Sequence, residues 1–104
     1  MPNPKPRDRD FMQQGAADAA AMLRTLGHEQ RLLVLCLLIE HGELAVGQLL
    51  AKVELSQSAL SQHLARIRED GLVACRREAQ TVHYRIADPR VETLVAALKS
   101  VFCP

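Results

Sequence analysis

The sequence contains few aromatic residues, with two Phe, one Tyr and no Trp among 104 residues. A core of this chain must therefore be aliphatic, and the abundance of Leu and Ala favours helices over strands. The longest apolar run spans only residues 32–39, well short of the roughly 20 residues that a helix needs to cross a bilayer. The length leaves no room for two independent cores. We expect one small, mainly helical domain without a membrane span.

The chain also lacks the features of a secretory signal and of a disulfide framework. Residues 1–10 combine prolines and charges with no apolar segment or small-residue cleavage site after them, which predicts a flexible tail followed by one folded domain over residues 11–104. The three cysteines, Cys36, Cys75 and Cys103, are too few and too scattered for a disulfide scaffold. These absences predict a cytoplasmic protein.

Apolar residues at helical spacing predict the helices of this domain. The first is expected over residues 11–26, with Met12, Leu23 and Leu26 on its buried face. A second, over residues 28–41, is apolar nearly all round and should lie in the centre of the core. A short helix over residues 46–52 follows. Together the Leu-rich central helix and the Ala- and Val-rich terminal helices carry more apolar surface than so small a fold can cover alone, which predicts a homodimer.

Two further helices carry clear start signals. Ser56 is a good N-cap for a helix that ends at Gly71, and this helix should bury Leu60, Leu64 and Ile67. Asp88 and Pro89 begin the last helix, because proline at the first helical position loses no hydrogen bond. The residues that this last helix is expected to bury are Val91, Leu94, Val95, Leu98 and Phe102.

The hydrophobic period changes from 3.6 to 2 over residues 72–78 and 81–87, which predicts a β-hairpin across Ala79 and Gln80. The resulting order, α-α-α-α-β-β-α, is that of a winged helix-turn-helix, a mainly α fold with a β-hairpin wing. In residues 57–85 five arginines oppose three carboxylates, whereas the whole chain carries a net charge of only +1. Any binding of nucleic acid must therefore come from this local patch.

The helix over residues 56–70 has a polar face that could read DNA. Gln side chains can pair with adenine in the major groove, and Ser can bond several base edges. The hairpin that follows would place Arg76, Arg77 and Arg85 beside the phosphates. The alternative is a helical domain whose polar face is merely solvated, and the basic hairpin directly after the polar helix weighs against it.

Three segments resemble the ArsR/SmtB family of bacterial winged-helix repressors: LSQSALSQHL at residues 55–64, EDGLV at 69–73 and RREAQTVHY at 76–84. The similarity is greatest to the HlyU, BigR and SqrR branch, which lacks metal sites and responds to oxidants or reactive sulfur. It implies a homodimer, with the first and last helices at the interface, on an inverted-repeat operator in double-stranded DNA. It also implies DNA contacts from the recognition helix, through Gln57, Ser58, Ser61, Gln62 and His63, and from the wing, through Arg76, Arg77, Gln80 and Thr81.

The same resemblance implies a role for two cysteines. Cys36 and Cys103 match the cysteine positions of the sulfur- and oxidant-responsive relatives, one in the second helix and one at the end of the last. Oxidants, persulfides or polysulfides would link them by a disulfide or a longer sulfur bridge and release the operator. The alternative is that each is a small buried hydrophobic residue. Cys75, on the first hairpin strand, is expected to be incidental.

Other functions find less support in the sequence. A metal-responsive repressor needs clustered thiolates or His and carboxylate ligands, but the family's thiolate positions fall near Ala45 and Gly47, and Arg90 stands where a histidine of the C-terminal-helix site would be. No glycine-rich phosphate loop or paired carboxylates indicate an enzyme or a bound cofactor. The remaining alternative function is that of a constitutive interaction module, in which the winged helix binds another protein instead of DNA.

Overall fold

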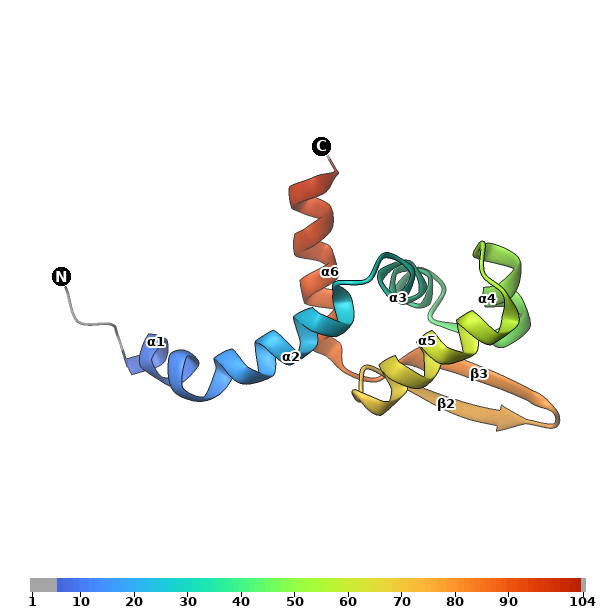
Figure 1. The fold of residues 1–104 in the computed structure, drawn as a ribbon, viewed down its shortest axis with the longest axis horizontal. Helices are drawn as coiled ribbons and strands as arrows, with labels where there is room; N and C mark the ends of the chain where they lie inside the picture. Colours follow the sequence, from blue (N-terminus) through green and yellow to red (C-terminus); the bar gives the residue numbers. More distant parts are fainter. Residues whose placement is uncertain (1–5, 104) are drawn as a thin grey trace.

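The computed structural model describes residues 6–103. Its elements follow the predicted order, with an added strand and a longer helical segment at the N-terminal end (Figure 1). In chain order they are α1 (Pro6–Asp10), a π-helical turn η1 (Phe11–Gly15), α2 (Ala16–Leu26), α3 (Glu29–His41), β1 (Glu43–Ala45), α4 (Val46–Lys52), α5 (Gln57–Glu69), β2 (Val73–Glu78), β3 (Thr81–Ile86) and α6 (Pro89–Phe102).

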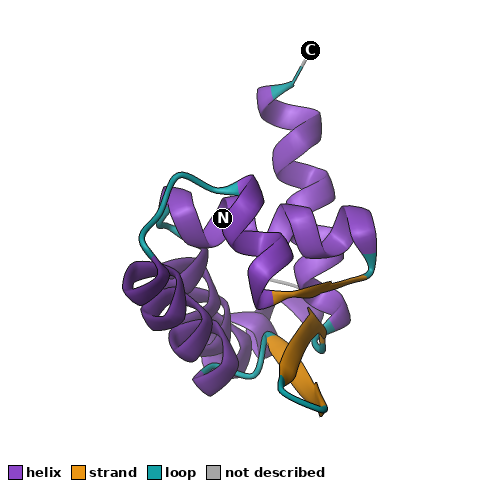
Figure 2. Ribbon diagram, turned by 90° about the vertical axis from the view of Figure 1, so that its right-hand side faces the viewer, coloured by secondary structure: helices purple, strands orange, loops and turns teal. Residues whose placement is uncertain are grey.

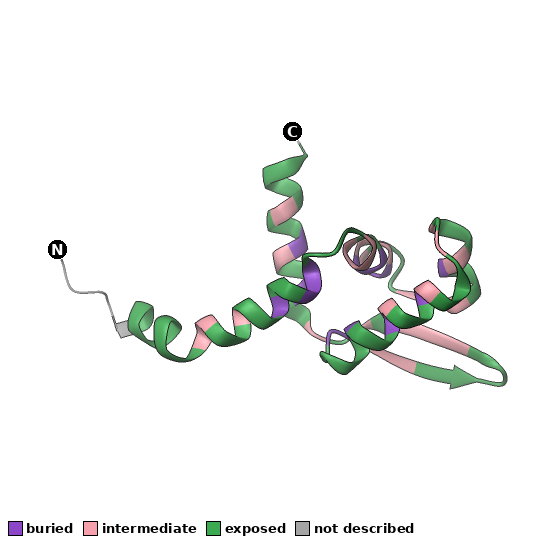
Figure 3. Ribbon diagram, viewed as in Figure 1, coloured by how far each residue is buried: buried purple, intermediate pink, exposed green. Residues whose placement is uncertain are grey.

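The N-terminal helical segment differs from its prediction in two ways. It begins at Pro6 rather than at residue 11, so part of the expected tail is helical, while residues 1–5 lie outside the described residues. The prediction of its buried face was also wrong, because Met12 and Leu23 are exposed and Met22 is buried with Leu26. Only the last turns of α2 reach the core, where Met22, Thr25 and Leu26 are its buried residues (Figure 3).

Helix α3 lies in the centre of the core, as its composition predicts. Val34, Leu35 and Leu38 have no exposed surface. The helix contacts α2, α5 and α6 as well as strands β1 and β3. Helix α5 packs onto it with the predicted stripe of Leu60, Leu64 and Ile67, all three buried. Among the described residues, the buried members of the core are aliphatic apart from Met22, and the half-buried Tyr84 packs against them, which agrees with the scarcity of aromatic residues.

The sheet contains three antiparallel strands in the order β1-β3-β2, grouped on one side of the helical body (Figure 2). The hairpin of β2 and β3 turns at Ala79 and Gln80, as predicted, and Ala79 has a φ of 54°. Strand β1 was not predicted, because its three residues are too few to show an alternating pattern. It pairs with β3 so that Glu43 lies opposite Arg85. The wing is therefore anchored to the body by a strand that precedes α4.

Both predicted N-caps are present. Ser56 accepts a hydrogen bond from the Ala59 N–H at 3.1 Å, and Asp88 accepts one from the Arg90 N–H at 2.9 Å. Helix α5 ends with Gly71 at a φ of 76°, a left-handed conformation that glycine adopts without strain. The Leu72 N–H then bonds the Ile67 carbonyl at 2.9 Å, which is the hydrogen bond of a Schellman motif. This C-cap directs the chain from α5 into the wing.

A buried hydroxyl joins α2 to the end of α5. Thr25 is fully buried, and its hydroxyl donates to the carboxylate of Asp70, the C-cap of α5. That carboxylate also accepts from Arg66 Nε at 2.9 Å. The Thr25 carbonyl in turn accepts from Arg31 Nε at 2.8 Å. The C-terminal ends of α2 and α5 are therefore held together with the start of α3.

The last helix buries only part of its predicted face. Val91 and Val95 are buried, and Leu94 and Leu98 are half-buried. The prediction for Phe102 was wrong, because this side chain is 76% exposed. The outer half of α6 extends away from the body, as the first helices do (Figures 1 and 3). None of the helices in residues 6–103 combines the length and apolarity needed to cross a membrane.

Candidate DNA-binding surface and cysteine cavity

Helix α5 presents a polar face opposite its buried stripe. Gln57, Ser58, Ser61 and Gln62 are all exposed. They fall at spacings of one, three and four residues, so they share one side of the helix. Ser56 caps the start of this helix and Gly71 follows its C-cap, so the caps determine where the helix begins and ends. This surface has the donors and acceptors needed to read base edges.

A groove separates the start of α5 from the tip of the wing. It has a volume of about 620 Å3 and is lined by Gln57 of α5, by Gln80 and Thr81 of the wing, and by residues of β1 and α4. At the start of α4 the Ala45 N–H donates to the side chain of Gln48 at 2.8 Å. The structure thus brings three of the candidate DNA-binding residues to one groove, although they come from two separate segments.

The register of the hairpin places the other wing residues on two faces. Arg77 lies opposite Val82, whereas Arg76 lies opposite His83 and Glu78 opposite Thr81. Directly opposed residues of antiparallel strands share a face, and successive residues alternate. Arg77 is therefore on the face of the sheet that carries the buried Val73. Arg76 and Thr81 are on the other face.

Arg76 is held by two carboxylates. Its guanidinium contacts Glu43 of β1 at 2.7 Å and Glu78 at 2.8 Å. These hydrogen bonds raise the pKa of the Arg76 guanidinium and lower the pKa values of both carboxyl groups. Its charge is balanced within the protein, which the sequence does not reveal because Glu43 is 33 residues away. Arg77 and Arg85 have no carboxylate at ion-pair distance among residues 6–103, so they are the stronger candidates for phosphate contacts.

His63 does not lie on the exposed polar face of α5. It is half-buried, and its ring packs against that of His28, with the centroids 4.6 Å apart. His28 is the N-cap of α3, where its side chain accepts a hydrogen bond from the Gln30 N–H. Burial, followed by the nearby His28 and Arg31, lowers the pKa of His63 below its ordinary value. These surroundings favour the neutral form of the His63 ring over its protonated form.

This shift predicts a stability change in mildly acidic solution. As the pH falls through 6.5, the ordinary value for histidine, the unfolded chain takes up a proton before folded His63 does, so the free energy of unfolding should decrease. Below the folded pKa the decrease from this residue should stop. Urea unfolding between pH 8 and 5 measures it, and His63→Gln should flatten the curve in this range. If the free energy of unfolding of His63→Gln depends on pH as steeply as that of the unmodified protein, other groups cause the effect.

Cys36 and Cys103 line the same cavity. This cavity has a volume of about 210 Å3 and lies between α3 and α6, with Leu32, Val95, Leu98, Lys99 and Phe102 as its other walls. Cys36 is half-buried and Cys103 is exposed. Both are free thiols, as is Cys75 on β2, which does not contribute to this cavity. The structure therefore brings together two residues that are separated by most of the chain.

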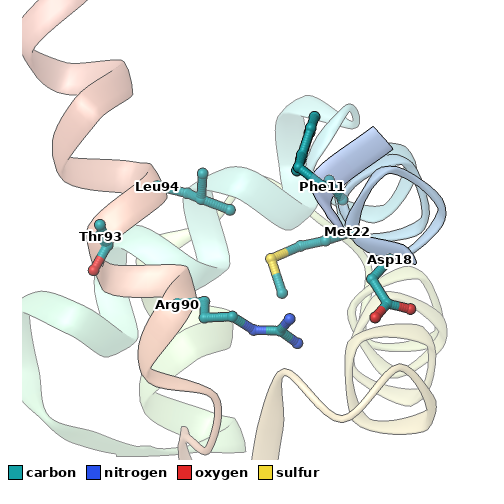
Figure 4. Close-up of a pocket in the computed structure, with 8 residues that line it drawn as sticks. Phe11, Asp18, Met22, Arg90, Thr93 and Leu94 are labelled. Atoms are coloured by element: carbon teal, nitrogen blue, oxygen red, sulfur yellow. The ribbon is translucent and has the colours of Figure 1, made fainter. Parts of the chain in front are cut away.

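A second apolar groove separates the N-terminal helices from α6. It has a volume of about 400 Å3, and Met22 and Leu94 line it together with Phe11 (Figure 4). Arg90 extends into it from α6 towards the side of α2 that carries Asp18, while its guanidinium contacts Asp88 at 2.7 Å. Sequence reasoning did not find this groove, because its walls come from opposite ends of the chain.

Across the described residues, no three His, Cys, Asp or Glu side chains are grouped so that they could hold a metal ion.

A capped helix with a polar exposed face, followed by a basic hairpin and joined to a helical body, defines a winged helix-turn-helix DNA-binding protein. Residues 28–74 match the family described as "Bacterial regulatory protein, arsR family". The chain belongs to the ArsR family and is a DNA-binding transcriptional regulator. The predicted fold class and family resemblance are thereby confirmed.

Several characterised members of the family are similar over most of this chain. The transcriptional activator HlyU of Vibrio cholerae is 44% identical over 94% of this chain and 90% of its own length. The biofilm growth-associated repressor of Agrobacterium fabrum is 42% identical over 88% of this chain and 78% of its own. The solved structure of the transcriptional repressor BigR from Xylella fastidiosa has a TM-score of 0.86 at 38% identity, covering 92% of this chain and 97% of its own.

Proposed function

We propose that this regulator is a homodimer that binds an inverted-repeat operator and leaves it when Cys36 and Cys103 become linked by an oxidant, a persulfide or a polysulfide. The observation that carries the proposal is the cavity between α3 and α6, which both Cys36 and Cys103 line. The similarity to the repressor BigR and to the biofilm growth-associated repressor supports a transcriptional regulator that acts chiefly as a repressor.

DNA binding divides between α5 and the wing. Gln57, Ser58, Ser61 and Gln62 of the exposed face contact base edges in the major groove. Arg77 and Arg85, which have no carboxylate partner among residues 6–103, contact phosphates. Gln80 and Thr81 follow the backbone along the groove that they share with Gln57. Arg76 supports the wing through its ion pairs, and His63 supports α5 against α3.

The dimer forms through the N-terminal helices and α6. Leu23 is 55% exposed and Val101 is 74% exposed, and Phe11, Met12 and Phe102 add to this apolar surface. So much exposed apolar area is unusual for a monomer. A symmetric contact between two such surfaces covers it and sets the distance between the two copies of α5.

Linking Cys36 to Cys103 would change the distance between the two copies of α5 in the dimer. A direct disulfide requires Cα atoms about 4.4–6.8 Å apart. Cys36 lies on the central helix, whereas Cys103 follows α6, whose outer half extends away from the body. The bond therefore fixes the end of α6 to α3. Because α6 also forms the proposed dimer surface, a displacement of α6 on linking would alter the spacing of the recognition helices and so couple the two sites.

The test combines intact-mass measurement with operator binding, using an inverted-repeat duplex selected from a random library. After treatment with peroxide or with glutathione persulfide, the unmodified protein should show a Cys36–Cys103 link and lose affinity for the operator. Cys36→Ser and Cys103→Ser should stay bound, and Cys75→Ser is the matched control that should respond normally. Release that survives in both Cys36→Ser and Cys103→Ser, or that requires Cys75, would contradict the proposal.

A salt titration in the same experiment separates DNA binding from protein binding. Neutralisation of phosphates makes the logarithm of the affinity fall linearly with the logarithm of salt concentration. A steep slope and preference for the selected duplex are expected. An affinity for duplex that is negligible at low salt would favour a module that binds another protein instead.

A further inference from the structure

We infer that Glu43 and Glu78 limit the attraction of the wing for DNA by holding the guanidinium group of Arg76 away from phosphates. The inference rests on the proposed division of DNA binding between α5 and the wing. It deepens that proposal, because it names two residues that restrict sequence-independent binding at the wing. Both carry a charge of the same sign as the DNA backbone.

All three nitrogen atoms of the Arg76 guanidinium group donate to carboxylates. Nε and Nη2 donate to separate oxygens of Glu43, at 3.1 and 2.7 Å, and Nη1 donates to Glu78 at 2.8 Å. Paired hydrogen bonds from a guanidinium group to a carboxylate are strong, and the same edge of the group would bind a phosphate. Arg76 can therefore contact DNA through this edge only after it leaves Glu43.

The strand order places the two carboxylates around Arg76. Arg76 and Glu78 are two residues apart on β2, so their side chains share one face of the sheet. We call this the outer face, because the buried Val73 lies on the other one. Glu43 reaches the outer face from β1, which is separated from β2 by β3. The contact between Arg76 and Glu43 therefore crosses a strand and depends on the complete sheet.

The carboxylates of the outer face match its guanidinium groups in number. Arg85 lies on this face opposite Glu43, and with Arg76 it provides the two positive charges that oppose Glu43 and Glu78. Hydrogen bonds from Arg76 hold the pKa values of both carboxyl groups below their ordinary value, so both are charged at neutral pH. Arg77, on the face that carries Val73, has no carboxylate at ion-pair distance within residues 6–103.

Glu78 is close enough to the tip of the wing to act on bound DNA. It precedes Gln80 by two residues, which separates their Cα atoms by at most about 7 Å. The Debye length at physiological salt is about 8 Å. Phosphate attraction supplies nearly all of the sequence-independent affinity for DNA. Removing the two carboxylates, and thereby releasing Arg76, should strengthen binding to any duplex.

The test measures binding of Glu43→Gln combined with Glu78→Gln to a random duplex between about 50 and 200 mM salt. The amides keep the size of both side chains and an oxygen that accepts from Arg76, so the wing should keep its structure. At low salt the affinity should rise about threefold or more. Over this range it should then fall about threefold more than that of the unmodified protein for each subunit on the duplex, the effect of one added phosphate contact. Adding Arg76→Gln should abolish this extra salt dependence.

The matched control is Glu40→Gln combined with Glu92→Gln, which removes two exposed carboxylates from α3 and α6. It should leave the salt dependence unchanged. Equal effects of the two pairs would assign the gain to net charge, and unchanged or weaker binding of the wing variant would show that the carboxylates do not restrain Arg76. Either result overturns the inference. Glu78→Gln alone, which keeps the pair with Glu43, should show part of the gain and provides the test if the double variant unfolds.

Arg77→Ala separates this inference from the proposed function. If this variant binds random duplex less tightly than the unmodified protein while the wing variant gains nothing, only the inference is overturned. If Arg77→Ala leaves both the affinity and its salt dependence unchanged, the wing does not contact DNA. That result would overturn the proposed division of binding together with the inference.

Discussion

Combining Leu23→Glu with Val101→Glu is expected to convert the proposed dimer to a monomer and to lower affinity for an inverted-repeat operator by about a hundredfold or more. Both side chains are exposed, at 55% and 74%, so the chain should fold without them. Burying two new charges per subunit at an apolar interface is costly. Because a dimer on two half-sites gains about 10²–10⁴ in affinity from the second contact, its loss should be large. Sedimentation and operator titration at one fixed salt concentration measure the two effects.

The matched control is Leu33→Glu. Leu33 is 46% exposed, but it lies on α3 and not on the terminal helices. This variant should remain a dimer and keep its affinity. Binding of the double variant to a single half-site should also resemble that of the unmodified protein, because α5 is untouched. A double variant that still sediments as a dimer would place the interface elsewhere.

Gln62→Ala is expected to lower affinity for the operator by about tenfold or more while leaving binding to random duplex nearly unchanged. A good contact to a base edge is worth about 1–3 kcal/mol per site, and a dimer loses two such contacts. Ser61→Ala should act in the same direction. Arg77→Ala, in contrast, should weaken binding to both duplexes and reduce the salt slope.

Titrations of both duplexes at the same salt concentration distinguish these effects. Gln30→Ala, on α3, serves as the control for loss of a glutamine outside α5. Equal losses on operator and random duplex for Gln62→Ala would show that this residue positions the backbone rather than reads bases.

Local signals were sufficient to predict the recognition helix. Ser56 and Gly71 mark its ends, and the spacing of its leucines predicts which face is exposed, so the orientation of Gln62 follows from about fifteen consecutive residues. The same holds for the hairpin turn at Ala79. Gln57, Ser58, Ser61 and Gln62 are therefore exposed as predicted, and the half-buried His63 lies at the border of their face.

Contacts between distant segments could not be predicted in the same way. Glu43 balances Arg76 through a strand too short to recognise, and His63 meets His28 only because α3 and α5 are packed together. Met22 is buried and Leu23 is exposed because of the side of α2 that meets the body, which the spacing of apolar residues along α2 does not determine. The two cysteines were paired by resemblance to a family, and their common cavity depends on the packing of α6 against α3.

The hydrogen bond between Thr25 and Asp70 fixes one end of α5, so that a tilt of this helix moves mainly its other end. It ties the C-terminal end of α5 to α2, while the residues proposed to read bases lie towards the opposite end. A helix of 13 residues is about 20 Å long at 1.5 Å per residue. A tilt of about 10° about Asp70 therefore moves its N-terminal end by about 3 Å, close to the ~3.4 Å rise of one base pair. In the proposed dimer, a small rotation of α2 that carries Asp70 with it is expected to move Gln57 and Ser58 by about this distance.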